Sequence, residues 1–268
     1  FSRGVYDQEA FFHWLNQDPD SIGLNRYVVG HSWGGYLALT SLQKNYNVLK
    51  VISISGFDTL YQLTLSHFPK VKYGHFLTVG SQAIGYPRFG NLSGLKLLKK
   101  SSVPFLYIQG TQDLMVPYSS FGARFQKELV NRPNTSFLIR QGWGHQPYWT
   151  LESQEYGDKV IQPSRLSSYT RDLDYPIDYS HFAYDDPIVV KTIIDFLANE
   201  GILLSAALVA ELVYALVSGA SPARGMSSTL IRAPNHSALV AQLDRVQPSE
   251  GWGQAFESPR AHQQNQKG

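Results

Sequence analysis

The chain has 268 residues, of which 43% are hydrophobic and 16% are charged, and its formal net charge is +2 at pH 7. This length accommodates one large domain with a substantial core, and the low charged fraction excludes an intrinsically disordered chain. The small net charge gives no general attraction to nucleic acid, so we expect no nucleic-acid partner. The chain contains no cysteine, which excludes disulfides and thiolate-bound metals and slightly favours a cytoplasmic location over secretion.

The first part of the chain is predicted to form two helices, with a strand and Ser32 between them. Apolar residues at helical spacing predict a helix over residues 6–16, and a short buried strand follows at 27–30. Gly30 and Gly34 have no Cβ, so the strand and the next helix can approach closely across the turn between them. The hydroxyl of Ser32 should therefore project outward from a tight strand-to-helix turn, in front of a helix N-terminus.

The rest of the first 200 residues alternates predicted strands with predicted helices. We expect strands at 48–55, 103–109 and 134–140, and helices at 36–45, 118–130 and 187–199. This alternation predicts a parallel sheet covered by helices on both faces. Two segments interrupt it, a mixed segment with two helices at 59–100 and an irregular, aromatic-rich excursion at 146–186.

Two polar residues follow later strands just as Ser32 follows the first one. Asp113 comes after the strand at 103–109 and His145 after the next strand, so all three side chains should meet at the carboxyl edge of the sheet. A serine hydroxyl needs a base, which His145 can supply, and Asp113 can orient that imidazole. The backbone N–H of Trp33, the residue after the serine, is then the expected oxyanion donor.

Each of these assignments has an alternative. Ser32 could be an ordinary helix cap, although this does not explain the glycines around it. Asp113 could be a turn residue, in which case Asp58, after the preceding strand, is the alternative acid. His145 could be a loop histidine, and His181 is its substitute. The remaining histidines show no metal-ligand spacing, so we expect no metal and no cofactor: His13, His67, His75, His236 and His262.

Three motifs in this order resemble those of serine hydrolases of the α/β-hydrolase superfamily. They are GHSWGG at 30–35, GTQDLMVP at 110–117 and GWGH at 142–145. The resemblance covers residues 6–199 and corresponds to the C-terminal portion of the family's domain. It implies an α/β-hydrolase fold, with a parallel sheet, helices on both faces and the N-terminal strands missing.

The resemblance also implies an activity. We expect cleavage of a carboxylic ester or a related acyl bond of a small-molecule substrate through an acyl-enzyme, with residues 59–100 as a small cap. Members of the superfamily take a second oxyanion donor from a loop before the nucleophile, and no such motif precedes Ser32. This gap leaves open a non-catalytic or truncated remnant that acts as a binding module. A serine peptidase of the same fold is a second alternative, because the superfamily's esterases and peptidases share the triad. The oligomeric state is left open.

The division of the chain into domains follows from the same resemblance. Residues 1–201 would form a partial α/β-hydrolase domain, in which the strand before Ser32 has an unpaired edge. Beyond it, the segment 202–220 is apolar, but Glu211 at its centre argues against a membrane helix. The strings AELVYALVSGASPARG and ALVAQLDRV…FESPRAH resemble read-through translation across tRNA genes, which implies that residues 202–268 form no folded domain.

Overall fold

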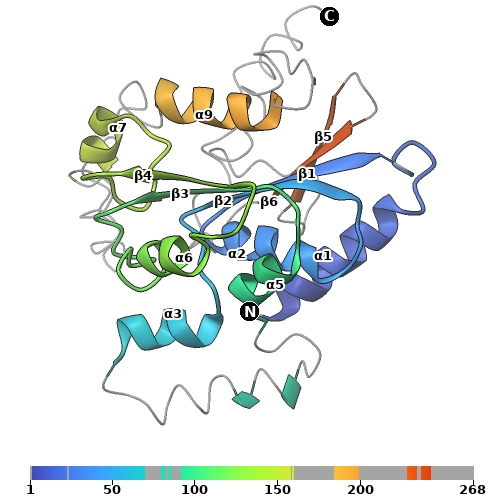
Figure 1. The fold of residues 1–268 in the computed structure, drawn as a ribbon, viewed down its shortest axis with the longest axis horizontal. Helices are drawn as coiled ribbons and strands as arrows, with labels where there is room; N and C mark the ends of the chain where they lie inside the picture. Colours follow the sequence, from blue (N-terminus) through green and yellow to red (C-terminus); the bar gives the residue numbers. More distant parts are fainter. Residues whose placement is uncertain are drawn as a thin grey trace, which may run out of the picture.

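A parallel sheet lies at the centre of the computed structural model, which describes residues 2–22, 24–69, 80–81, 84–85, 92–157, 159, 184–198, 228–233 and 237–242. The strand order is β4-β3-β2-β1-β6-β5 (Figure 1). Four consecutive neighbours are parallel: β1 (Asn25–His31), β2 (Val48–Ile54), β3 (Phe105–Gly110) and β4 (Thr135–Arg140). Their carboxyl ends therefore lie along one edge of the sheet.

Helices cover both faces of this sheet, as the sequence predicts (Figure 1). One face carries α1 (Ser2–Leu15), α2 (Trp33–Thr40), α5 (Gly94–Lys100) and α6 (Gly122–Glu128). The other face carries α9 (Pro187–Ala198). The predicted α/β-hydrolase fold, with part of the sheet, is confirmed.

Alternation along the strands divides the core into two layers. Val28, Val51 and Phe105 are buried on the side of α1 and α2, whereas Tyr27 and Ile52 are buried on the side of α9. Successive strand residues point to opposite faces, so a strand buried on both faces needs a nearly continuous apolar run. Each fully buried side chain of this size contributes about 1.5–3 kcal/mol.

The expected unpaired edge beside β1 is wrong. β6 (Ser237–Gln242) pairs in parallel with β1, and β5 (Ser228–Ala233) pairs antiparallel with β6. The physical reason is that the N–H and C=O groups along a buried strand need partners, which an apolar extended segment such as SALVAQ supplies. The domain boundary at residue 201 stays a prediction, and residues 202–220 lie outside the described residues. No helix in the described part of the chain is long and apolar enough to cross a membrane.

Several element boundaries differ from expectation. The first helix begins at Ser2, and the helix expected at 36–45 ends at Thr40, followed by a 3-10 turn at Ser41–Gln43. The excursion at 146–186 is not wholly irregular, because it opens with α7 (Leu151–Tyr156), whose cap residue Thr150 accepts a bond from Ser153 N. Residues 160–183 of this excursion are outside the described ranges.

The predicted cap segment, residues 59–100, contributes to two layers. Its first helix, α3 (Leu60–His67), lies beyond the helices that cover the sheet (Figure 1). Its last helix, α5, buries Leu95 and Leu98 in the core. The α5 end of this segment therefore belongs to the helical layer of the main fold.

Candidate active site

Ser32 occupies a strained turn between β1 and α2. Its φ is 55° and its ψ is −114°, a conformation that residues other than glycine rarely adopt. Two backbone bonds hold it there, from its N–H to Ile54 O at 2.8 Å and from Tyr36 N to its carbonyl at 3.1 Å. A Cβ added at Gly30 would lie 2.1 Å from Gly34 O, so β1 and α2 approach too closely for any larger residue.

The side chain of Ser32 makes no capping bond to the helix that follows it. A serine that served only as a helix cap would accept a bond from an N–H of the first turn. Ser32 is 9% exposed, at the carboxyl end of β1. Trp33 next to it is the first residue of α2, so its N–H belongs to the helix turn whose donors lack intrahelical acceptors.

Asp113 and His145 are in direct contact. His145 Nδ1 lies 3.0 Å from Asp113 Oδ1 and 2.9 Å from Oδ2. The carboxylate can only accept, so Nδ1 carries a proton and Nε2 of the neutral imidazole is left unprotonated. This is the tautomer that a general base requires.

The Asp113 carboxylate is buried but well satisfied. Its Oδ1 accepts bonds from Met115 N at 2.9 Å and Val116 N at 2.8 Å. Burial alone would raise the pKa of Asp113, but the hydrogen bonds from His145, Val116 and Gln109 and the charge of His145 lower it below its ordinary value. Asp113 is therefore ionised at neutral pH.

Asp58, the alternative acid, makes different contacts. Its Oδ1 accepts bonds from Ser93 Oγ at 2.6 Å and Leu95 N at 2.9 Å, and its Oδ2 lies 3.1 Å from Arg124 Nη1. The carboxylate thus ties the start of α5 to α6. His181, the substitute for His145, lies outside the described residues.

The loop that carries His145 is packed tightly against the end of β3. A Cβ at Gly110 would lie 2.1 Å from Trp143 O, and Gly144 N donates to Gln154 Oε1 of α7 at 2.5 Å. The Trp143 ring lies 3.9 Å from the guanidinium of Arg140. This packing fixes the path of the loop just before His145.

The sequence did not indicate two further polar contacts in this loop. His31 Nε2 lies 2.8 Å from the carbonyl oxygen of His145, and Ser55 Oγ donates to the same oxygen at 3.0 Å. The sequence signal that could have indicated them is their position: His31 directly precedes Ser32, and Ser55 directly follows the strand that pairs with β1. No group of three His, Asp or Glu side chains among the described residues is placed to hold a metal ion.

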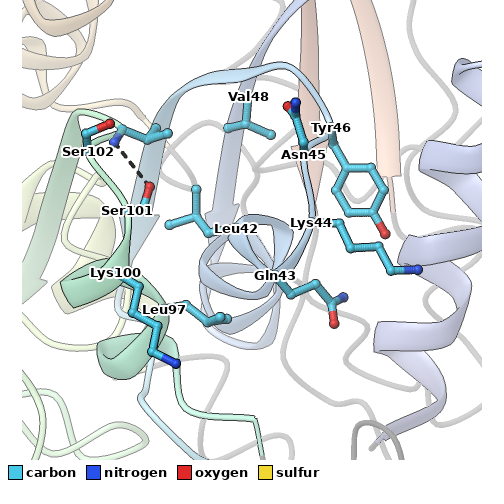
Figure 2. Close-up of a pocket in the computed structure, with 11 residues that line it drawn as sticks. Leu42, Gln43, Lys44, Asn45, Tyr46, Val48, Leu97, Lys100, Ser101 and Ser102 are labelled. Carbon is cyan, nitrogen blue, oxygen red and sulfur yellow. Dashed lines mark hydrogen bonds between the residues drawn. The ribbon is translucent and has the colours of Figure 1, made fainter.

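A cavity of about 560 Å³ lies at the opposite edge of the sheet. Its lining includes Val48 and Val103, at the start of β2 and just before β3, and the side chains of Lys44 and Lys100 (Figure 2). Ser32, Asp113 and His145 follow the other ends of their strands. This cavity is therefore separate from the candidate active site.

Known structures with a similar fold include both peptidases and an esterase. They are Pyrococcus horikoshii acylaminoacyl peptidase (19% identity, 54% of this chain, 24% of that chain, TM-score 0.41), Pyrococcus furiosus esterase Pf2001 (16%, 62%, 61%, 0.39) and a Mycobacterium tuberculosis puromycin-hydrolyzing peptidase (20%, 53%, 22%, 0.39). The chain thus spans less than two thirds of the length of each of these proteins. No curated protein sequence matches it.

The sequence profile described as the prolyl oligopeptidase family matches residues 2–160. This range is more than half of the chain, and it contains the turn at Ser32, the buried Asp113 and the loop of His145. The chain therefore belongs to the prolyl oligopeptidase family.

Proposed function

We propose that the protein is a serine hydrolase that cleaves a carboxylic ester or a related acyl bond through an acyl-enzyme on Ser32. The observation that carries this proposal is the contact between His145 Nδ1 and both oxygens of Asp113. It gives His145 the tautomer of a general base, at the sheet edge where Ser32 is held in a strained turn.

The roles follow from these positions. His145 Nε2 takes the proton of Ser32 as Oγ attacks the substrate carbonyl carbon, and Asp113 stabilises the imidazolium that forms. The Trp33 N–H stabilises the negative charge on the carbonyl oxygen, and a donor of this kind contributes about 3–4 kcal/mol to the transition state. His145 then protonates the leaving alcohol, and water hydrolyses the acyl-serine with His145 again as base.

A peptide bond is the second candidate substrate, because the matching family is the prolyl oligopeptidase family. An amine leaves far less readily than an alkoxide and depends more on protonation by His145. An amide and an ester of the same acyl group therefore separate the two candidates. Measurable hydrolysis of the amide favours a peptidase, whereas hydrolysis of the ester alone favours an esterase.

We place substrate selection in the segment 59–100. One contact supports this: His67 Nε2 of α3 lies 2.7 Å from Met115 O, two residues beyond Asp113. The segment therefore reaches the turn that holds the acid. Exchanging residues of α3 should change the preference among acyl groups more than it changes the rate of probe labelling.

A fluorophosphonate probe tests the proposed nucleophile in the purified full-length protein. The wild type should be labelled, and Ser32→Ala should not be. Ser41→Ala is the matched control, because it removes a buried hydroxyl that donates to Ala38 O at 2.7 Å and is remote from the proposed reaction. A folded wild-type protein that takes no label would overturn the proposal and favour the non-catalytic binding module.

A further inference from the structure

The backbone carbonyl of His145 accepts two hydrogen bonds from side chains on other elements. The donors are His31, the last residue of β1, at 2.8 Å, and Ser55, the residue after β2, at 3.0 Å. Both donors are buried, with His31 6% and Ser55 0% exposed. A carbonyl oxygen with a donor on each of its two lone pairs is fully satisfied, which fixes its direction as well as its position.

The protonation state of His31 follows from its acceptor. A carbonyl oxygen only accepts, so Nε2 of His31 carries a proton. Burial, and next the neighbouring His145, lower the pKa of His31 to about 3, so the ring is neutral at pH 7. His31 therefore donates a hydrogen bond to the His145 backbone without adding a positive charge beside the His145 imidazole, whose ring centroid is 4.7 Å away.

The same two strand ends also hold the proposed nucleophile. His31 directly precedes Ser32, and Ser55 directly follows Ile54, whose carbonyl accepts the Ser32 N–H at 2.8 Å. The ends of β1 and β2 thus form hydrogen bonds both to the backbone of Ser32 and to the backbone of His145. The relative position of these two residues does not depend on the loop of His145 alone.

We propose that His31 is a positioning residue for the catalytic base, and that with Ser55 it fixes the His145 backbone relative to Ser32. This inference rests on the proposed function, in which His145 deprotonates Ser32. A displacement of about 1 Å of a reacting group can cost about 100-fold in rate, so a bond that fixes the base contributes to kcat without contacting substrate.

The competing role for His31 is packing alone. Its ring makes an edge contact with Tyr148, with centroids 5.1 Å apart, as any planar ring could. Two substitutions separate the roles. His31→Phe keeps a planar ring and removes the donor, whereas His31→Gln removes the ring and keeps an N–H donor at a similar reach.

The experiment measures kcat, KM and the rate of fluorophosphonate labelling for the full-length wild type and both variants, with thermal unfolding as a check of folding. We expect His31→Phe to lower kcat and the labelling rate about 10- to 100-fold, with KM nearly unchanged, because the base is displaced and the substrate contacts are not. His31→Gln should stay within a few-fold of wild type. A labelling rate of His31→Phe equal to or above that of His31→Gln would overturn the inference.

Ser55→Ala provides a second test that leaves the His31 ring in place. It removes the other donor to the same carbonyl and should lower kcat several-fold, whereas the control Ser41→Ala should not. Ser55→Ala with wild-type labelling would count against the inference even if His31→Phe failed to fold. Absence of labelling in the wild type is a different outcome, which overturns the proposed function itself.

Discussion

Both edges of the sheet carry residues with a positive φ, but the residue types differ between the edges. Before β2 and β4, Asn47 and Asn134 have φ of 55° and 56°, and after β1 and β2, Ser32 and Ser55 have φ of 55° and 47°. Asparagine adopts a positive φ readily, so it costs little where the chain enters a strand. Serine adopts it at a higher cost, and each serine is held by bonds to a neighbouring strand. Strain at the carboxyl edge therefore accompanies the proposed chemistry, whereas the amino edge shows ordinary turn preferences.

Substitution of the buried carboxylate of Asp113 should have the largest effect on kcat. Asp113→Asn, at the carboxyl edge, should lower kcat about 10⁴-fold, because an amide stabilises the wrong tautomer of His145 and does not stabilise its cation. Asp58→Asn removes a carboxylate from the helical layer and should weaken the ion pair with Arg124 while kcat stays near wild type. Steady-state kinetics of both variants make the comparison. A loss of kcat only in Asp58→Asn would assign the acid to Asp58 instead.

Acid should destabilise the protein through His31. The pKa of His31 is about 3 in the folded chain and 6.5 when the ring is exposed, so the unfolded chain binds more protons between these values. Stability therefore falls as the pH drops through this window, by about 2–3 kcal/mol from pH 7 to pH 4.5. Urea unfolding at the two pH values should show a smaller difference in His31→Gln than in wild type. Equal differences would show that His31 is not buried as a neutral ring.

The C-terminal end of α9 offers a test of stability that does not involve the proposed reaction. At the amino edge of the sheet, Lys50 Nζ donates to Phe196 O at 2.8 Å and Leu197 O at 3.1 Å, two carbonyls in the last turn of this helix. Lys50→Met should destabilise the protein by about 1–3 kcal/mol, because the carbonyls lose their donor, and should leave kcat unchanged. Chemical denaturation and kinetics measure both. A fall in kcat would show that the edges are coupled through α9.

The smallest expected effect concerns strain itself. Ser55→Gly and Ser55→Ala both remove the hydroxyl, but glycine adopts a φ of 47° freely, so Ser55→Gly should be about 1 kcal/mol more stable. Both variants should lose the same fraction of kcat. Thermal unfolding together with kinetics separates strain from hydrogen bonding. Equal stabilities would show that the conformation of Ser55 costs nothing.

The features predictable from sequence are those set by local patterns. Alternating apolar runs locate β1–β4, and glycines on both sides of Ser32 locate the turn, because each depends on neighbours in the chain. The positions of Asp113 and His145 at one edge follow from parallel pairing, which the alternation with helices implies.

The remaining features depend on register and on distant partners. His31 lies opposite Ile54, and this pairing places Ser55 within reach of the same carbonyl as His31. No local pattern states that register. The contacts of Asp58 with α5 and α6, and the pairing of β6 with β1, likewise join segments far apart in the sequence. The expectation of an unpaired edge beside β1 failed because that strand's backbone pairs with a segment that the linear sequence does not name.

The two hydrogen bonds to the His145 carbonyl also have a consequence for when the candidate active site forms during folding. The partners are 114 residues apart for His31 and 90 for Ser55, so they meet only after β1 to β4 have paired in order. Distant contacts of this kind form late, because the chain must first close the long loops between them. During refolding, probe reactivity should therefore appear after helical structure, with the completion of the four-stranded sheet.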